Sequence, residues 1–222
     1  STGTKTFVGG TNPASMPNTF VNNTTLLTIE ATVLNGKTVS GNGDITLHDA
    51  VTIGQTFAGI NNSTGTKTFV GGTNPASMPN SFDQSSGTLE ATATVLTGKD
   101  IDGAGNVRVT ALNDKLDADF GLINNSGTRV ALFEGSAIFE GNLSTFTTEV
   151  TAGNEMTITA ALADGKTING DGDVVVTALH STTAADLRGI TGNGDRTAAF
   201  DGTDTFTGHL GSFTTTVSAN NT

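Results

Sequence analysis

The sequence contains no cysteine, no tryptophan and no tyrosine, and only 4 of its 222 residues are proline. The lack of cysteine excludes disulfide bridges, thiolate metal sites and cysteine nucleophiles. No apolar run is long enough to span a bilayer as a helix, so no transmembrane segment is predicted. Charged residues make up only 14% of the chain, which is less than disordered tails of high net charge contain.

Positive charge is especially scarce, with 10 Lys and Arg against 21 Asp and Glu and a formal net charge of −11. Binding to a nucleic-acid backbone depends on clustered Lys and Arg, so no nucleic-acid partner is expected. A negative surface is compatible with cation binding or with solubility alone.

Glycine is abundant, with 29 residues, and Thr, Asn, Asp and Ser are frequent. Thr and Val favour strands, whereas Gly, Asn and Asp favour tight turns. This composition therefore predicts many short strands joined by many turns.

The sequence is an internal repeat. Residues 1–20, STGTKTFVGGTNPASMPNTF, return at 63–82 with one change, Thr19 to Ser81. The offset of 62 continues from 31–50 to 93–112, and a third copy at 160–179 is displaced by 67. All three copies share a Gly-Lys pair, then Gly-x-Gly, then alternating apolar residues. We therefore predict one continuous array: a partial repeat at 1–30 and repeat units at 31–92, 93–159 and 160–222. Because the array begins partway through a unit, residue 1 is not expected to start the gene product.

The 12 phenylalanines support this alignment independently, because all of them fall into repeat columns. The columns are Phe7, Phe69, Phe133 and Phe200; Phe20, Phe82, Phe146 and Phe213; Phe57 and Phe120, with Leu187; and Phe139 with Phe206. These columns predict core positions.

Each unit divides into segments of roughly twenty residues, each with short alternating stretches between Gly/Asn/Asp corners. Such a segment buries its apolar face only by stacking on a similar one. The predicted fold is therefore all-β, a repetitive β-solenoid with coils of about 20 residues. The alternative is a row of small β-sandwich domains, although about 65 residues is short for a sandwich. A short helical turn is compatible with 111–123 and 178–190, because Leu112, Leu116 and Phe120 lie four residues apart.

Calcium is the strongest chemical suggestion. The corners at 41–47, 170–176 and 192–195 resemble the Gly-x-Gly-x-Asp turns of calcium-binding β-rolls. Asp44, Asp171, Asp173 and Asp195 would present the carboxylate oxygens that calcium prefers. The alternative is a tight turn that needs Gly and Asx residues, and Asn106 replaces the carboxylate in the middle unit.

No Ser/His/Asp constellation and no fixed carboxylate pair recurs in every unit, so no catalytic residue is assigned and an enzyme is not expected. The three histidines, His48, His180 and His209, have no second ligand at metal-binding spacing and are interpreted as surface residues.

The unit DGKTINGDGDVVVTAL…ADLRGIT…TFTGHLGSFTTTV resembles the β-strand repeats of very long bacterial surface and secreted proteins, which are adhesins, matrix proteins and filament components. The resemblance implies an extracellular structural or adhesive role and carries over no site residues. The expected function is a non-enzymatic, self-associating repeat protein that forms a stiff rod or filament at the cell surface. The alternative is a receptor- or glycan-binding fibre of the phage tail-fibre kind.

Overall fold

A computed structural model describes residues 5–7, 17–47, 56–61, 63–70, 78–200, 202–203 and 205–217. The chain forms two compact units, each with its own strands and core. The first comprises Ser1–Val109 with Phe120–Arg129, and the second comprises Thr110–Asp119 with Val130–Thr222. The division into a partial repeat and three repeat units stays a prediction.

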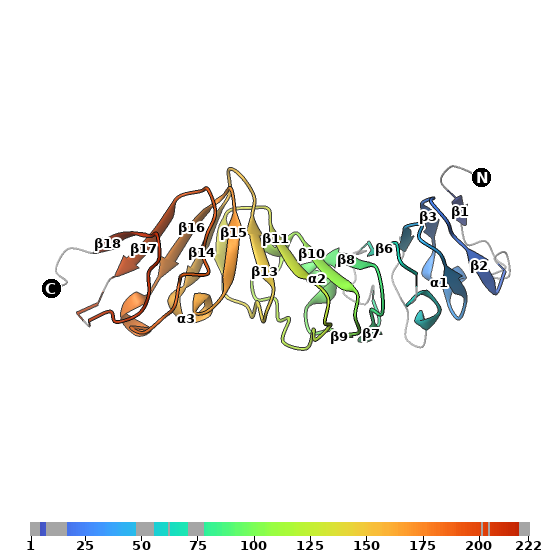
Figure 1. Cartoon of the computed structure of the whole chain (residues 1–222), viewed down its shortest axis with the longest axis horizontal. Coiled ribbons are helices and arrows are strands. Elements are labelled where there is room, and N and C mark those ends of the chain that lie inside the picture. Colours follow the sequence, from blue (N-terminus) through green and yellow to red (C-terminus); the bar gives the residue numbers. More distant parts are fainter. Residues whose placement is uncertain are drawn as a thin grey trace. The chain divides into compact units, whose positions relative to one another are not determined.

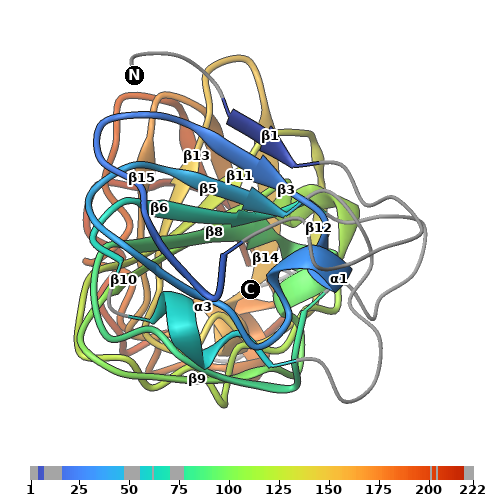
Figure 2. The ribbon, with the colours of Figure 1, turned by 90° about the vertical axis from the view of Figure 1, so that its right-hand side faces the viewer.

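The first unit is built from short parallel strands (Figures 1 and 2). Its strands are β1 (Lys5–Phe7), β2 (Thr19–Val21), β3 (Leu27–Ile29), β4 (Thr38–Ser40), β5 (Ile45–Leu47), β6 (Thr66–Phe69), β7 (Ser81–Asp83), β8 (Thr88–Thr92), β9 (Asp100–Asp102) and β10 (Asn106–Thr110). The main strand order is β1-β3-β5-β6-β8-β10, with β2 beside β4 and β7 beside β9. The pairs from β1 to β8 in this order are parallel, as are the two smaller pairs.

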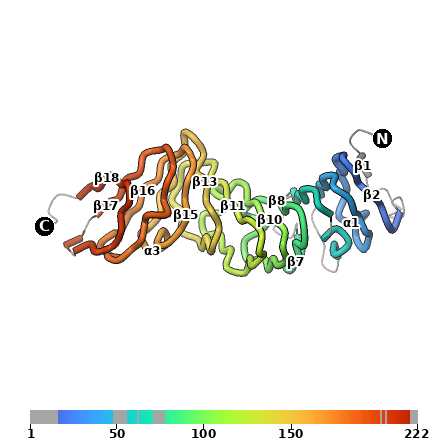
Figure 3. The backbone as a smooth tube through the Cα atoms, in the orientation of Figure 1, coloured from blue at the N-terminus to red at the C-terminus, as the bar shows by residue number. Residues whose placement is uncertain are grey.

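The second unit follows the same scheme. Its strands are β11 (Arg129–Phe133), β12 (Ala137–Phe139), β13 (Thr147–Val150), β14 (Glu155–Thr159), β15 (Thr167–Gly170), β16 (Asp173–Thr177), β17 (Arg196–Phe200) and β18 (Thr214–Val217). They pair in parallel in the orders β11-β13-β15 and β12-β14-β16-β17-β18. Figure 3 shows the backbone of this unit passing through successive turns whose straight segments lie side by side.

Paired strands lie close together in sequence. Within the described strands, paired residues are separated by 17 residues at the least, as from Thr197 to Thr214, and by 22 at the most, as from Thr66 to Thr88. A parallel pair requires a crossover, so each such stretch makes one turn of the chain and returns beside its own beginning. We call each stretch a rung. The expectation of a β-rich fold is confirmed and its sheets are parallel, whereas the alternative β-sandwiches would have antiparallel sheets.

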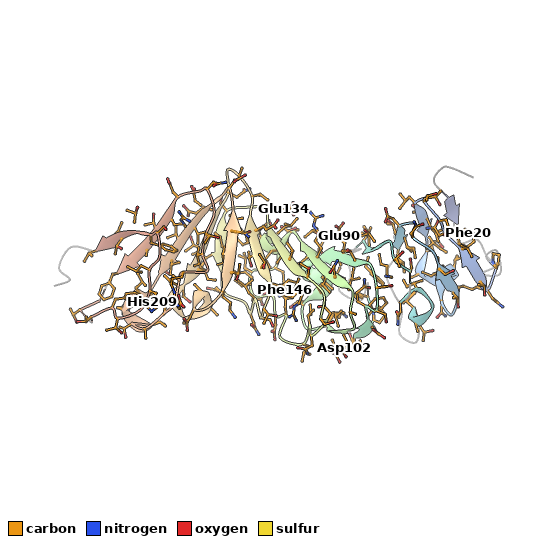
Figure 4. The ribbon with its side chains drawn as sticks, viewed as in Figure 1. Phe20, Glu90, Asp102, Glu134, Phe146 and His209 are labelled. Atoms are coloured by element: carbon orange, nitrogen blue, oxygen red, sulfur yellow. The ribbon has the colours of Figure 1, made fainter. Side chains whose placement is uncertain are left out.

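Side chains alternate between the interior and the surface along the strands. In β10, Val107 and Val109 are buried, whereas Arg108 points outward. This is the period of two that a strand imposes on a half-buried sheet. Figure 4 labels one residue of each kind, the buried Phe146 of the second unit and the exposed Asp102 of the first.

The phenylalanine columns do form core positions. The buried members are Phe57, Phe69, Phe82, Phe120, Phe133, Phe139 and Phe146, together with Leu187. The rings of Phe57 and Phe69 meet edge to face at 6.1 Å, and those of Phe69 and Phe82 at 5.8 Å. Phe20, Phe200, Phe206 and Phe213 are only half-buried, and the Phe7 side chain lies outside the described part of the chain.

Three one-turn α-helices recur at the repeat offsets of 62 and 67 and were not predicted. They are α1 (Ala31–Leu34), α2 (Ala93–Leu96) and α3 (Ala160–Ala163). Their inner residues, such as Val33 and Leu34, are fully buried. Among the residues that the structure describes, three 3-10 turns accompany them: η2 (Ala58–Ile60), η3 (Leu112–Asp114) and η4 (Leu179–Ser181). The helical turn considered for 111–123 is therefore limited to η3, which follows Ala111 in the left-handed conformation.

Replacing Phe139 with alanine should therefore cost much more stability than replacing Phe206, its repeat equivalent. Phe139 is fully buried, so its loss leaves a cavity worth about 3–5 kcal/mol. Phe206 is half-buried and should cost less than half as much. Urea unfolding followed by far-ultraviolet circular dichroism measures both changes. Equal losses for the two variants would contradict the assignment of a rung interior at Phe139.

Candidate functional site

The turns between strands, which we call corners, carry the recurring residues of the Gly-Lys and Gly-x-Gly-x-Asp stretches. These corners are therefore the candidate site. Four predicted calcium ligands lie there: Asp44 in the first unit and Asp171, Asp173 and Asp195 in the second. Asp44, Asp171 and Asp195 are exposed, and Asp173 is half-buried.

The corner side chains connect one rung to the next through hydrogen bonds to backbone N–H groups. The Oδ1 atom of Asp44 accepts from Thr66 N (2.9 Å), that of Asn106 from Thr128 N (2.9 Å), and that of Asp173 from Asp195 N (2.7 Å). These three acceptors occupy equivalent positions of the three repeats. Asn106 performs the same function as the two aspartates, because only an acceptor oxygen is needed. This explains why the middle unit tolerates the loss of the carboxylate.

Asp171 and Asp195 take part in the same system. The Oδ1 atom of Asp171 accepts from Asn193 Nδ2 at 2.7 Å, and Asp195 contributes its backbone N–H to Asp173. In the part of the chain that the structure describes, no three His, Asp or Glu side chains form a metal-ligand group. Calcium binding by the four aspartates stays a prediction.

The glycines of the Gly-x-Gly corners leave room for the preceding rung. A Cβ atom on Gly43 would lie 2.5 Å from Thr25 O and 2.6 Å from Asn22 Nδ2. A Cβ atom on Gly105 would lie 2.8 Å from Gln84 O. The second glycine of the motif therefore recurs because the backbones approach too closely for a side chain, whether or not a metal binds.

Inside this corner of the first unit lies a column of buried polar side chains, which sequence reasoning missed. Its members are Asn22, Ser63, Lys67, Gln84 and Asn125, all at most 1% exposed. Asn22 Nδ2 donates to Thr25 O at 3.1 Å and to Asp44 O at 3.0 Å, and Asn125 Nδ2 donates to Gly105 O at 2.7 Å. These amides satisfy turn carbonyls that the strands cannot reach.

Lys67 is the charged member of the polar column. Its Nζ donates to the carbonyls of Ser63 and Ser86, both at 2.6 Å, which joins two successive rungs. Burial lowers the pKa of the Lys67 ammonium group to about 8, because a charge is poorly solvated inside the protein.

A second set of lysines explains the recurring Gly-Lys pair. Lys37 Nζ donates to Asn18 Oδ1 at 2.7 Å, Lys99 Nζ to Met78 O at 3.1 Å and Asn80 Oδ1 at 2.9 Å, and Lys166 Nζ to Ser144 O at 2.8 Å. Each acceptor lies 19 to 22 residues earlier, on the preceding rung. Burial also lowers the pKa of Lys99. The glycine before each lysine has a positive φ, between 65° and 69°, which explains the pair.

His180 and His209 occupy positions that hold asparagine in the preceding repeat. His180 corresponds to Asn113 and His209 to Asn142 at the offset of 67. Asn142 Nδ2 donates to Asp119 Oδ1 at 3.0 Å. In the next repeat His209 pairs with Asp186 in a parallel β-bridge, as Asn142 does with Asp119. His209 is exposed at the surface of the second unit (Figure 4). His48 lies outside the described residues.

The first unit has a pocket of about 310 Å³. It is lined by Thr56, Phe57, Ala58, Asn61, Pro79, Ser81, Phe82 and Asp83. The two rings are only 2% and 5% exposed, so neither presents a face on which a sugar ring could stack. The pocket therefore does not favour the glycan-binding alternative.

Comparison of the chain with protein-family models, with curated proteins and with solved structures finds no match. Among the described residues, no helix has the length and apolar character needed to cross a membrane.

Replacing Lys67 with methionine should remove a pH-dependent part of the stability. The unfolded chain keeps this proton up to about pH 10.5, whereas the folded protein releases it near pH 8. Between these values the unfolded state binds more protons, so the free energy of unfolding rises with pH, by about 3 kcal/mol in all. Below pH 8 the group contributes no slope. Urea unfolding at several pH values should show the rise in the wild type and not in Lys67→Met.

The same substitution should not destabilise the protein at pH 7. Ser63 O keeps a hydrogen bond from Ser86 Oγ at 3.1 Å, and Ser86 O keeps one from Gln84 Nε2 at 2.8 Å. Lys37→Met is the matched control, because it removes a half-exposed lysine and keeps Lys67. If Lys67→Met retained the full rise above pH 8, the burial of this ammonium group would be contradicted.

The calcium prediction requires that millimolar calcium raise the melting temperature by several degrees over the same protein in EDTA, because a ligand of the folded state stabilises it. Magnesium at the same concentration is the control, since it is smaller and more strictly octahedral. Identical melting temperatures in all three solutions would contradict calcium binding. The aspartates would then serve only as hydrogen-bonding corner residues.

Proposed function

We propose that this chain is a β-solenoid whose function is structural: a non-enzymatic extracellular repeat protein that forms a stiff rod or filament at a bacterial cell surface, and adheres through it. The observation that carries the proposal is the parallel pairing of strands 17 to 22 residues apart in both units. Such pairing stacks successive rungs in the same direction, as a solenoid requires.

The repeated residues support a structural role. The Gly-x-Gly glycines, the corner Asp and Asn residues, the Gly-Lys pairs and the phenylalanine columns all contact the neighbouring rung. What the sequence repeats is therefore what joins one rung to the next. Repetition of this kind increases the length of a solenoid without duplicating a chemical site.

Cell-surface location and self-association belong to the same proposal and rest on the resemblance to surface repeat proteins. On the described surface the strands carry Thr, Asp and Asn outward, and the net charge of the chain is −11. Both are compatible with a location at the cell surface. The partner classes are a second copy of the chain and a glycan or surface receptor.

Negative-stain imaging of the purified 222-residue chain tests the proposal. Rods that lengthen or join into filaments as concentration rises are expected. Short, discrete trimers would overturn the proposal in favour of a receptor-binding fibre of the phage tail-fibre kind.

A matched pair of variants shows whether stacked rungs build these particles. Gly105→Val places a side chain against Gln84 O and should abolish the rods. Ala104→Val introduces the same side chain at the neighbouring exposed position and should preserve them.

A further inference from the structure

The sheet β12-β14-β16-β17-β18 of the second unit carries a regular array of outward side chains. Its strands pair in parallel, so outward residues of successive strands form columns across the sheet. In the first column each residue is the Cα partner of the next: Ile138, Thr157, Val175, Thr197 and Thr214. The second column lies two residues further along the strands and consists of Thr159, Thr177, Ala199 and Thr216. We call these nine residues the threonine array.

Both columns of the threonine array face the surface. The residues between them, Ile158, Val176 and Ala198, are fully buried, and side chains alternate along a strand. The members on β12 and β18 are exposed, and those on β14, β16 and β17 are half-buried. Figure 1 shows β14, β16 and β17 side by side.

The array is a product of the stacking of rungs. Thr-x-Thr occurs in only two of its five strands, at Thr157 in β14 and at Thr214 in β18. Val175 and Ala199 continue the columns between them without adding a charge. Strands of one sheet thus bring together threonines that are up to 59 residues apart, from Thr157 to Thr216.

The chemistry of the array selects the kind of partner. The chain has a net charge of −11, yet none of the nine residues is charged, and the acidic pair Glu155 and Asp173 forms the neighbouring column. A charged partner therefore finds no complementary group within the array. None of the nine residues is aromatic, so no ring is present on which the sugars of a crystalline polysaccharide could stack. A neutral partner that binds hydroxyl and methyl groups fits best.

The spacing of the array favours an ordered partner. Neighbouring residues of one column lie about 4.8 Å apart, and the two columns lie about 6.6 Å apart along the strands. Water oxygens on the faces of hexagonal ice form a two-dimensional repeat of similar dimensions. Threonine is stiff at χ1 and the strand pairing fixes its backbone, so little ordering remains to be paid for when water binds to the array.

We propose that the threonine array is an ice-binding surface. The threonine hydroxyl groups hydrogen-bond to water molecules of the crystal face, because each hydroxyl both donates and accepts. The methyl groups of threonine, Val175 and Ala199 lie between these water molecules. Ice binding is a further function of the second unit and does not depend on the assembly of filaments.

Thr177→Lys tests the array, because it places a long charged side chain in the second column, on β16. Thr157→Lys makes the same change in the first column, on β14, so the test does not depend on one variant that folds. Thr147→Lys is the matched control, since Thr147 is a half-buried threonine on β13 of the other sheet. Circular dichroism checks the fold of each variant.

Two measurements report ice binding: the gap between the melting and freezing points of a single ice crystal in the protein solution, and the fraction of protein taken up by slowly growing ice. We expect the wild type and Thr147→Lys to show the same gap and the same uptake. Thr177→Lys and Thr157→Lys should lose both.

A wild type that shows no gap and is excluded from ice would overturn ice binding. Equal activity of all four proteins would overturn the threonine array as its site. Without ice activity, binding of the wild type but not of Thr177→Lys to microcrystalline cellulose or chitin would replace ice with a polysaccharide surface as the ligand of the array.

Discussion

Stacking of one rung on the next, at the spacing of hydrogen-bonded strands, is the constraint on which the rest of the structure depends. A rung of about twenty residues contains strands of three to five residues and cannot bury its own apolar side chains. Neighbouring strands lie about 4.8 Å apart, so each inward side chain must pack on its equivalents above and below. In the first unit aromatic rings meet this requirement, because Phe69 contacts both Phe57 and Phe82 edge to face.

The same spacing governs the corners. Where the chain turns, backbone N–H and C=O groups leave the strand pairing and must find partners on the next rung. Asp44 and its equivalents supply acceptors from outside, whereas Asn22 and Asn125 supply donors from inside. Glycines such as Gly105 remain bare because the adjacent backbone occupies the space of a Cβ atom. Corner chemistry of this kind is repeated with every unit, which explains why the sequence repeats most clearly at its polar and glycine positions.

The sequence predicted the strand-rich fold and the phenylalanine core, because alternation and repetition are visible along a single chain. It did not predict α1–α3, since Ala-Thr-Val-Leu in α1 and α2 and Ala-Ala-Leu-Ala in α3 are too short to show a helical period, and the first of these contains β-branched residues that favour strands. The role of the Gly-Lys lysines was also missed, because each acceptor lies 19 to 22 residues away and depends on the register of the rungs. Gly-x-Gly-x-Asp predicted calcium because metal turns and hydrogen-bonded corners share that spacing. The two kinds of turn differ in the partner that the Asp side chain binds, and in the hydrogen-bonded corners this partner is a backbone N–H on the next rung, outside the motif.

Lys67, the buried cation of the polar column, bears on the register of the rungs, which is the alignment of one rung on the next. Rungs here differ in length by several residues, so even spacing cannot define which rung packs on which. Apolar contacts discriminate poorly, because Val, Ile and Leu pack acceptably in more than one alignment. The ammonium group of Lys67, by contrast, donates to two fixed carbonyls, those of Ser63 and Ser86, which lie on two successive rungs. Arg129 and Arg196 hold the equivalent positions of later repeats, and Arg129 Nη1 donates to Ile123 O at 2.9 Å. A buried charge lowers stability compared with a well-packed apolar residue, but an unpaired one would lower it far more. Lys67 thus joins two successive rungs at a cost in stability, and a cation recurs at the same position in the later repeats.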